Sequence, residues 1–497
     1  MKKPVDHETL SSLVAASIGR ADFTKRYGLD SPEREADIKD VCAQIEKSGI
    51  EVIRFSFVDT NGQLRTRPIE ARHFAQAARN GVPFTTALFA MDSANNIFQP
   101  VFSADGGFGR TTMGGAGDML AVADLSTFRP IPWAKNSALI LTNLYLTDAE
   151  PCPFDPRRVM REACARLLEQ GLLYVGGVEV ECHVFKVTDP RLGMEDCTQP
   201  ARPATVEAYR HGYQYMSQLV LDEYEPVIDA LRRALIDLGL PLRTLECEWG
   251  PGQLEITLDP LIGVEAADAV IMMRTAVKQV VRRMGMIASF MTKPGLPNVF
   301  SCGWHLHESL AWADGRGNAF VSAQTPISDL GLHFVGGLLK HVRAGTAFSN
   351  PTINGYKRLN ANPLAPKRAV WSIDNKAAMC RLVGGVADRS THIENRSGEP
   401  LANPYLYMAS QIFAGLDGMA NKESPGDPLT DPYGQTSQPL MPGSLMESID
   451  ALSQSSLYRK VMSDEFIDHF VGMKRHEIGR FLSTVTDWEH QEYFESY

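Results

Sequence analysis

The spacing of hydrophobic residues divides the chain into an early part rich in short strands and a later part in which long helices alternate with strands. In residues 51–69, alternating apolar residues stop at Asp59-Thr-Asn-Gly62 and resume at Leu64, which is typical of two strands joined by an Asn-Gly turn. A further strand is expected at Ala138–Tyr145. These elements predict a mixed N-terminal domain over residues 36–148.

The helical pattern becomes prominent after residue 150. Asp155-Pro156 places a capping aspartate and a proline at the start of a helix, and apolar residues at helical spacing predict longer helices at 263–289 and 329–345. Short strands are expected between them, at Tyr174–Phe185, Leu245–Glu248, Leu254–Leu258 and Trp304–Leu310. No linker rich in Gly, Ser and Pro interrupts residues 149–497, which we interpret as one large α+β domain. Residues 1–35, with a helical stretch around Glu8–Ile18, are interpreted as an N-terminal extension.

Composition narrows the functional classes. The chain has 497 residues, with 49 Lys and Arg against 59 Asp and Glu, and this acidic balance argues against non-specific nucleic-acid binding. No stretch approaches the ~20 apolar residues of a membrane span, and the N-terminus lacks the apolar core of a secretory signal. The 8 cysteines form no C-x-x-C pair, so neither a disulfide scaffold nor a zinc knuckle is indicated. We therefore expect a cytoplasmic protein with reduced thiols.

Two segments bring glutamates together. Glu179 and Glu181 share one face of a predicted strand, because positions i and i+2 of a strand point the same way. Glu248 and Glu255 flank a Gly-Pro-Gly bend that lets both carboxylates converge. Close like charges are costly unless a cation neutralises them. For either segment alone, an exposed polar strand face or a simple turn is an open alternative.

Two further segments add imidazole and guanidinium groups. His305 and His307 share a strand face, although a buried core histidine is the common alternative for each. Glu394 and Arg396 share another face, and arginine is suited to hold a carboxylate or phosphate through two hydrogen bonds.

Taken together, oxygen and imidazole donors without a thiolate suit hard divalent cations such as Mg²⁺ or Mn²⁺. Basic residues accompany them in the sequence: Lys357, Arg358, Lys376, Arg381 and Arg396. Divalent cations with a basic cluster favour phosphoryl transfer. Neither a G-x-x-x-x-G-K-[ST] loop nor a G-x-G-x-x-G motif after a strand is present, so a P-loop or Rossmann nucleotide site is not supported.

An ordered series of motifs now carries a resemblance: VEVE, EWGPGQLEI, FMTKP, HLHESL, NGYKRLNANPLAPKRAVW, IENR and LANPYLYMASQIFAGLDG. The series resembles the glutamine synthetase family. The resemblance implies a β-grasp N-terminal domain on a catalytic α+β domain, and stacked rings of subunits, such as a dodecamer, that share active sites between neighbours. It also implies that ATP phosphorylates glutamate to γ-glutamyl phosphate and that an amine then attacks this intermediate.

The resemblance assigns metal ligands by position. Glu181, Glu248 and Glu255 match the ligands of one metal ion, and Glu179, His305 and Glu394 match those of a second ion beside the ATP phosphates.

It also assigns the substrate groups. Arg358 and Arg396 match arginines that hold glutamate and its developing phosphate, and Arg381 matches an arginine that contacts phosphate. Lys376 and His392, expected near the nucleotide, stand where relatives usually have arginine. His307 is expected to border the nucleotide or substrate. Asp92 loosely matches an aspartate that a neighbouring subunit donates to the amine site.

Departures from the family pattern concern the amine. Ammonia-using relatives carry a glutamate where this chain has Leu364, and a leucine cannot accept a proton. Phe300 and Trp304 add aromatic bulk in a second altered loop. An aromatic amine is already neutral at pH 7 and needs little help in losing a proton. The sequence therefore predicts an ATP-dependent carbon–nitrogen ligase, acting in amine catabolism, that joins glutamate to an apolar or aniline-like amine.

Three alternatives remain open at this point. The chain could be an ammonia-using glutamine synthetase with an altered flap, because loop drift also explains Leu364. It could be a polyamine or alkylamine γ-glutamyl ligase. It could also be a catalytically inactive structural member of the fold.

Overall fold

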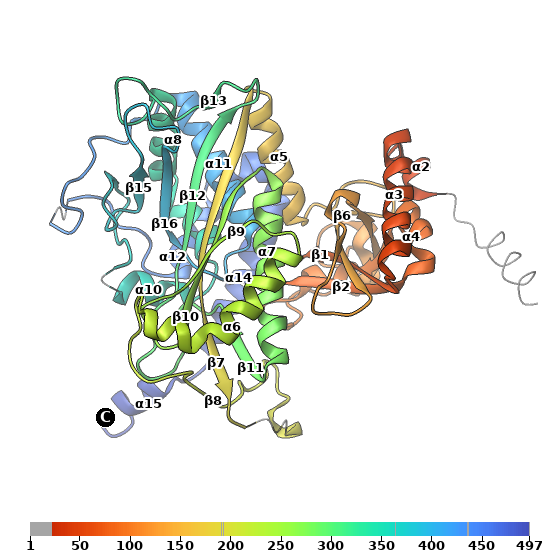
Figure 1. The fold of residues 1–497 in the computed structure, drawn as a ribbon, viewed down its shortest axis with the longest axis horizontal. Helices are drawn as coiled ribbons and strands as arrows, with labels where there is room; N and C mark the ends of the chain where they lie inside the picture. Colours follow the sequence, from red (N-terminus) through yellow and green to blue (C-terminus); the bar gives the residue numbers. More distant parts are fainter. Residues whose placement is uncertain (1–21, 190, 192, 363, 435–436, 497) are drawn as a thin grey trace, which may run out of the picture. The chain divides into compact units, whose positions relative to one another are not determined.

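The computed structural model describes residues 22–189, 191, 193–362, 364–434 and 437–496, drawn as a ribbon in Figure 1. Contacts divide the chain into two compact units. The smaller unit comprises the chain up to Phe57 together with Arg65–Leu88 and Pro100–Cys152, and the larger unit comprises Val58–Leu64, Phe89–Gln99 and Pro153–Tyr497. The helical stretch expected at Glu8–Ile18 lies outside the described residues.

The smaller unit is built on a sheet of order β2-β1-β6-β4-β3, with β5 beside β6. Its strands are β1 (Val52–Val58), β2 (Leu64–Glu70), β3 (Val82–Thr85), β4 (Asp118–Ala123), β5 (Arg129–Pro130) and β6 (Ser137–Tyr145). Its helices are α2 (Phe23–Arg26), α3 (Pro32–Ser48) and α4 (Phe74–Asn80). The pairing of β1 with β2 confirms the predicted hairpin, and the strand expected at Ala138–Tyr145 is also present.

The larger unit contains a sheet of order β14-β15-β16-β12-β7-β10-β9, with β8 and β11 paired to β7 and β13 paired to β12. Its strands are β7 (Leu172–Val187), β8 (Val206–Glu207), β9 (Leu242–Cys247), β10 (Gln253–Ile262), β11 (Met286–Ser289), β12 (Trp304–Trp312), β13 (Gly317–Asn318), β14 (Trp371–Ile373), β15 (Cys380–Val383) and β16 (His392–Gly398). All four strands predicted in this part of the chain are therefore found.

The larger unit also contains a series of helices. They are α5 (Pro156–Leu168), α6 (Gln218–Asp237), α7 (Val264–Arg283), α8 (Asp329–Lys340), α9 (Val342–Ser349), α10 (Gly355–Ala361), α11 (Pro404–Asn421), α12 (Leu445–Ser453), α13 (Ser456–Met462), α14 (Asp464–Leu482) and α15 (Asp487–Tyr493). Both α5 and α7 pack on β7, and α11 packs on α5, α7 and α8 (Figure 1). Alternate residues Val178, Val180 and Cys182 are buried, and a Cβ at Gly176 would touch Ala266 of α7. The residues between them, including Glu179 and Glu181, therefore face away from these helices.

Two helix predictions are wrong at their ends. The helix expected at 263–289 ends at Arg283, because Gly285 adopts a positive φ of 76° and the chain continues as β11. The helix expected at 329–345 is two helices, since His341 leaves the helical conformation at φ −99° and ψ 8° between α8 and α9. These local changes leave the mixed α+β architecture as predicted. Among the described helices, none is long and apolar enough to cross a membrane.

Candidate active site

A cavity of about 590 Å³ lies in the larger unit, on the face of β7 that carries Glu179 and Glu181. Ten residues predicted for the site line it: Glu179, Glu181, Glu248, Glu255, Phe300, His305, Arg358, Leu364, Lys376 and Arg396. The cavity brings together residues from 179 to 396, and strand pairing explains how.

The register of the sheet concentrates the carboxylates. His305 of β12 pairs directly with Glu179 of β7, and Glu255 of β10 pairs with Glu181. On the other edge of β12, Glu394 of β16 pairs with His307. Directly paired residues in an antiparallel sheet have side chains about 5 Å apart on the same face. Four strands therefore contribute their acidic and imidazole groups to one continuous patch.

The concentration of carboxylates at this patch favours the binding of cations. Burial, reinforced by the charges of Glu179, Glu181 and Glu248, raises the pKa of Glu255 far above its usual range. Burial also raises the pKa of Glu181 to about 7, against the opposing charge of Arg358. Buried carboxylates that lie this close together stay protonated, because their charged form is unfavourable unless a positive ion lies between them. Oxygen and imidazole donors without a thiolate fit a hard divalent cation.

Two groups of three residues have donor atoms close enough to share an ion. In each group the atoms lie within 4.8 Å of one another: Glu179, Glu255 and His305 form the first, and Glu179, His307 and Glu394 the second. Burial would raise the pKa of Glu179, but His305 and His307 together hold it well below its usual range. Glu179 accordingly links the two groups. The prediction from the resemblance had placed His307 at the nucleotide or substrate, whereas its ring here also adjoins the second group.

His392 orients His307. Its Nδ1 lies 2.6 Å from the carbonyl oxygen of Ser390, so Nδ1 carries the proton and donates. The other nitrogen of His392, Nε2, then accepts from Nδ1 of His307 at 2.9 Å. His307 Nε2 lies 3.0 Å from Glu179 Oε2: a proton on Nε2 makes the hydrogen bond that lowers the pKa of Glu179, and a divalent cation in its place would take the lone pair of the neutral ring. A lone pair beside a carboxylate is a place for a cation, and a partner that fixes the tautomer is typical behind a metal-binding histidine.

Arg358 is a buried cation at the bottom of the cavity. Its Nη2 donates to the carbonyl oxygen of Arg396 at 3.1 Å and lies 3.4 Å from His305 Nε2. Gly303 makes room for it, because a Cβ at that position would lie 2.6 Å from Arg358 Nη2. The backbone N–H of Gly303 also donates to Glu181 at 3.1 Å.

The other two predicted arginines are held by Glu394. Arg396 lines the cavity and pairs with Glu394, and its buried Nε has no hydrogen-bond partner in the part of the chain that the structure describes. Arg381 pairs with Glu394 at 3.0 Å and with Asp374. Arg381 and His392 lie beside the second group of three rather than among the lining residues of the cavity.

Large apolar side chains stand exposed around the opening of the cavity. Trp249 is 42% exposed, Leu364 53% and Tyr433 59%. The rings of Tyr215 and Phe300 lie 5.3 Å and 6.2 Å from that of Trp249. We call the four aromatic residues among them, Tyr215, Trp249, Phe300 and Tyr433, the aromatic rim. Exposed apolar side chains that gather at a cavity usually mark a binding surface.

Two predicted site residues lie elsewhere. Trp304 is fully buried and packs edge-on against Tyr407, because alternation along β12 turns it to the face opposite His305. Asp92 is also fully buried, with Oδ2 2.9 Å from Arg480 Nε, and it does not line the cavity. The expectation that Trp304 adds surface for the amine is therefore wrong.

The structure adds residues that sequence reasoning missed. Gln253 donates from Nε2 to Glu181 at 2.5 Å, and its spacing of two from Glu255 on β10 was a usable signal. Glu246 lines the cavity from β9, likewise two residues from Glu248. Tyr215 and Tyr433 come from loops, and no pattern in the sequence pointed to them.

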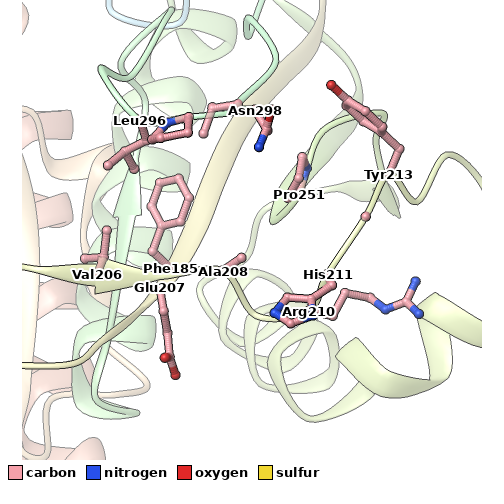
Figure 2. A pocket seen from close by; sticks show the side chains of 13 residues that line it. Phe185, Val206, Glu207, Ala208, Arg210, His211, Tyr213, Pro251, Leu296 and Asn298 are labelled. Carbon is pink, nitrogen blue, oxygen red and sulfur yellow. The ribbon is translucent and has the colours of Figure 1, made fainter.

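A second cavity of about 480 Å³ has a different lining. Phe185, Val206 and Leu296 gather on one side of it, with Pro251 and Tyr213 on the other (Figure 2). Glu207 is the one carboxylate among its described lining residues, so this cavity lacks the acidic cluster of the first.

Comparisons with known proteins identify the family that the chain resembles. A family model described as glutamine synthetase, catalytic domain, matches residues 153–493. The chain is 37% identical to a γ-glutamylanilide synthase of an Acinetobacter species, over 96% of this chain and 99% of that protein. It is 29% identical to a glutamate–isopropylamine ligase of a Pseudomonas species, over 94% and 99%. A solved structure described as a GmaS/ADP complex superposes with a TM-score of 0.77 at 26% identity, covering 91% of this chain and 99% of that one.

Proposed function

The chain belongs to the glutamine synthetase family, and on that premise we propose that it is an ATP-dependent ligase that joins the γ-carboxylate of glutamate to an organic amine. The acceptor in this proposal is an aromatic or apolar amine of the aniline class. The observation that carries the choice of acceptor is the aromatic rim beside a buried acidic and cationic floor. Two of the relatives described above are named for organic amines, one for an anilide and one for isopropylamine.

Divalent ions, Mg²⁺ or Mn²⁺, belong to this proposal together with ATP. Glu181, Glu248 and Glu255 would hold one ion, and Glu179, His305 and Glu394 a second. All of these except Glu394 line the cavity, and donor atoms of Glu179, Glu255 and His305 lie within 4.8 Å of one another. Bound there, such ions neutralise phosphate charge and orient the transferred group.

Positively charged side chains of the protein would bind the anionic groups of the substrates. Arg358 is buried and makes no hydrogen bond to a carboxylate of the described residues, so it can hold an oxygen of glutamate or of the transferred phosphoryl group. Arg396 offers its unpartnered Nε to the same space. Lys376, which lines the cavity, is proposed for the nucleotide phosphates together with Arg381 and His392. Phosphoryl transfer from ATP to the γ-carboxylate gives an acyl phosphate, and attack by the amine nitrogen at its carbonyl carbon expels inorganic phosphate.

The aromatic rim suits a neutral acceptor. Leu364, exposed at the opening, provides an apolar contact and no proton-accepting group. An aniline nitrogen carries a free lone pair at pH 7, so attack needs no carboxylate to remove a proton first. The ring of such an acceptor can pack against Trp249, and pairs of aromatic rings contribute roughly 0.5–1.5 kcal/mol beyond buried area.

An alkylammonium or polyamine acceptor is the second candidate, because Glu246 lines the cavity and makes no ion pair within the described part of the chain. A free carboxylate there would attract a cationic amine. Substitution Glu246→Gln separates the candidates: it should lower kcat/KM for alkylamines and leave kcat/KM for aniline unchanged.

The proposal includes self-association into rings, with a β-grasp fold for the smaller unit. Exposed apolar residues near the C-terminal end support an interface, namely Leu482, Val485, Trp488 and Phe494. Light scattering of the purified protein tests this, and a monomer at micromolar concentration would contradict it.

The test of function is phosphate release with glutamate, ATP and Mg²⁺ across a panel of amines. We expect the highest kcat/KM with aniline-class amines, and Trp249→Ala should lower kcat/KM for aniline about tenfold while changing that for ammonia much less. Substitution Trp312→Ala, a partly buried tryptophan outside the cavity lining, is the matched control. Turnover that is highest with ammonia would contradict the choice of acceptor, and no ATP turnover with any amine would favour an inactive structural member.

A further inference from the structure

A third cavity, of about 650 Å³, lies in the larger unit away from the catalytic residues. This cavity and the 590 Å³ cavity of the candidate active site share no lining residue. Its walls come from one face of α7, the end of β11, the loop at 61–64 and the segments around Thr352 and Leu401. Among the described residues that line it there are three cations, Arg274, Lys278 and Lys474, and no aspartate or glutamate.

Arg274 is a buried charge that has no counter-ion among the described residues. It is 9% exposed, and Nη1 donates to the carbonyl oxygens of Pro400 at 2.8 Å and Ala402 at 3.0 Å. Its Nη2 has no hydrogen-bond partner, and no described carboxylate pairs with the guanidinium. Although burial lowers the pKa of Arg274 to about 10, the group remains charged at neutral pH. An unpaired buried charge is expensive, and an anion beside it would relieve the cost.

Lys278 adds a second positive charge one helical turn away. Positions 274 and 278 are four residues apart on α7, so the two like charges lie on one face and repel each other. Lys278 is exposed and makes no ion pair within the described residues. Lys474 differs, because its ammonium already pairs with Glu477 at 2.9 Å. Arg274 and Lys278 are therefore the two uncompensated cations of this cavity.

The other lining residues indicate which chemical groups the rest of a ligand would have. Ile271 precedes Arg274 by one turn on α7, and Ile287 and Phe290 come from the end of β11. The hydroxyl groups of Thr275 and Ser289 stand among these apolar side chains. A cavity that combines two free cations with apolar walls fits a small organic anion better than a bare inorganic ion.

We propose that this cavity binds a small organic anion, with its carboxylate or phosphate head at Arg274 and Lys278 and its apolar body against Ile271, Ile287 and Phe290. Hydrogen bonds link the proposed site to the segment that follows Arg396 of β16. Glu399 lies three residues after Arg396. Its carboxylate accepts hydrogen bonds from the hydroxyl of Thr292 at 2.7 Å and from that of the cavity residue Thr352 at 2.8 Å. Arg274 holds the next carbonyl, that of Pro400.

Isothermal titration of the full chain tests the proposal, with saturating ADP, Mg²⁺ and glutamate present so that the catalytic cavity is filled. The probes are benzoate and phenyl phosphate, which share a body and differ in the anionic head. We expect saturable binding of at least one probe at one site per chain, and the preferred probe identifies the head group.

Substitution Lys278→Gln should weaken this binding about fivefold, and Lys278→Glu should abolish it. The matched control is Arg282→Gln, four residues further along α7, exposed and outside the cavity lining, which should leave affinity unchanged. Substitution Arg274→Met tests the buried charge, with the Lys278 variants as the readout if it fails to fold. The absence of saturable binding with both probes, or equal weakening by Lys278→Gln and Arg282→Gln, would overturn the proposal.

Discussion

Substitution Gly303→Ala tests the role given to Arg358 without touching its side chain. A Cβ at position 303 would lie 2.6 Å from Arg358 Nη2, and carbon and nitrogen need about 3.5 Å, so the guanidinium must retreat by about 1 Å. It has little freedom to do so, because Nη2 donates to the carbonyl oxygen of Arg396 and Nη1 lies 3.4 Å from that of Ser397. A displacement of about 1 Å in a positioning group costs about 10²-fold in rate.

We therefore expect kcat/KM for glutamate to fall about 100-fold, with aniline and ATP saturating, which corresponds to about 2.7 kcal/mol of transition-state stabilisation. The backbone N–H that Gly303 donates to Glu181 is retained in the variant. Phosphate release is the assay, with thermal unfolding as the check on folding. Gly295→Ala in the same loop is the control, because a Cβ there meets nothing within 4 Å. Activity of Gly303→Ala within threefold of that control would refute the role of Arg358.

Further predictions concern the acceptor and stability. Leu364→Glu should raise kcat/KM for ammonia relative to aniline at least about tenfold, whereas Leu364→Gln, of similar size but unable to accept a proton, should not; equal ratios in the two variants would contradict the reasoning. Asp268→Asn removes the partner that Arg157 holds at 2.8 Å in a buried pair and should cost about 3–5 kcal/mol in urea unfolding, whereas Asp314→Asn, in an exposed pair, should leave stability nearly unchanged. Burial raises the pKa of Glu308 to about 8 from an ordinary 4.5, so the folded protein holds this proton longer than the unfolded chain as pH rises. The stability of the native protein relative to Glu308→Gln should therefore fall between about pH 4.5 and pH 8, by at most about 1.4 kcal/mol per pH unit; a constant difference would contradict the shift.

The acidic centre was predictable because its members sit on strands. A spacing of two placed Glu179 with Glu181, and His305 with His307, on common faces, and the structure keeps both pairs together. The pairing of β7 with β12 was not predictable, because register depends on contacts between segments more than a hundred residues apart. The same alternation, applied to Trp304, would have turned it away from the cavity. Trp304 was placed there by the resemblance of its loop alone.

The loops at the site and some helix ends could not be predicted, for a different reason. Tyr215 and Tyr433 reach the aromatic rim from irregular segments whose course no periodicity encodes. The break at His341 falls inside a sequence that keeps an apolar helical spacing across it, so periodicity could not reveal it. The end after Arg283 did carry a local signal, because Gly285 follows it in a positive-φ conformation. Asp92 matched a family position loosely, and its burial beside Arg480 could not be seen in the sequence.

The central claim is that the acceptor is an organic, aromatic amine. A single reaction containing glutamate, ATP, Mg²⁺ and equimolar aniline and ammonia at pH 7 tests it directly, with both products quantified by mass spectrometry. The aromatic rim and Leu364 predict that γ-glutamylanilide exceeds glutamine by at least about tenfold, which corresponds to about 1.4 kcal/mol of discrimination. Glutamine as the main product would contradict the account.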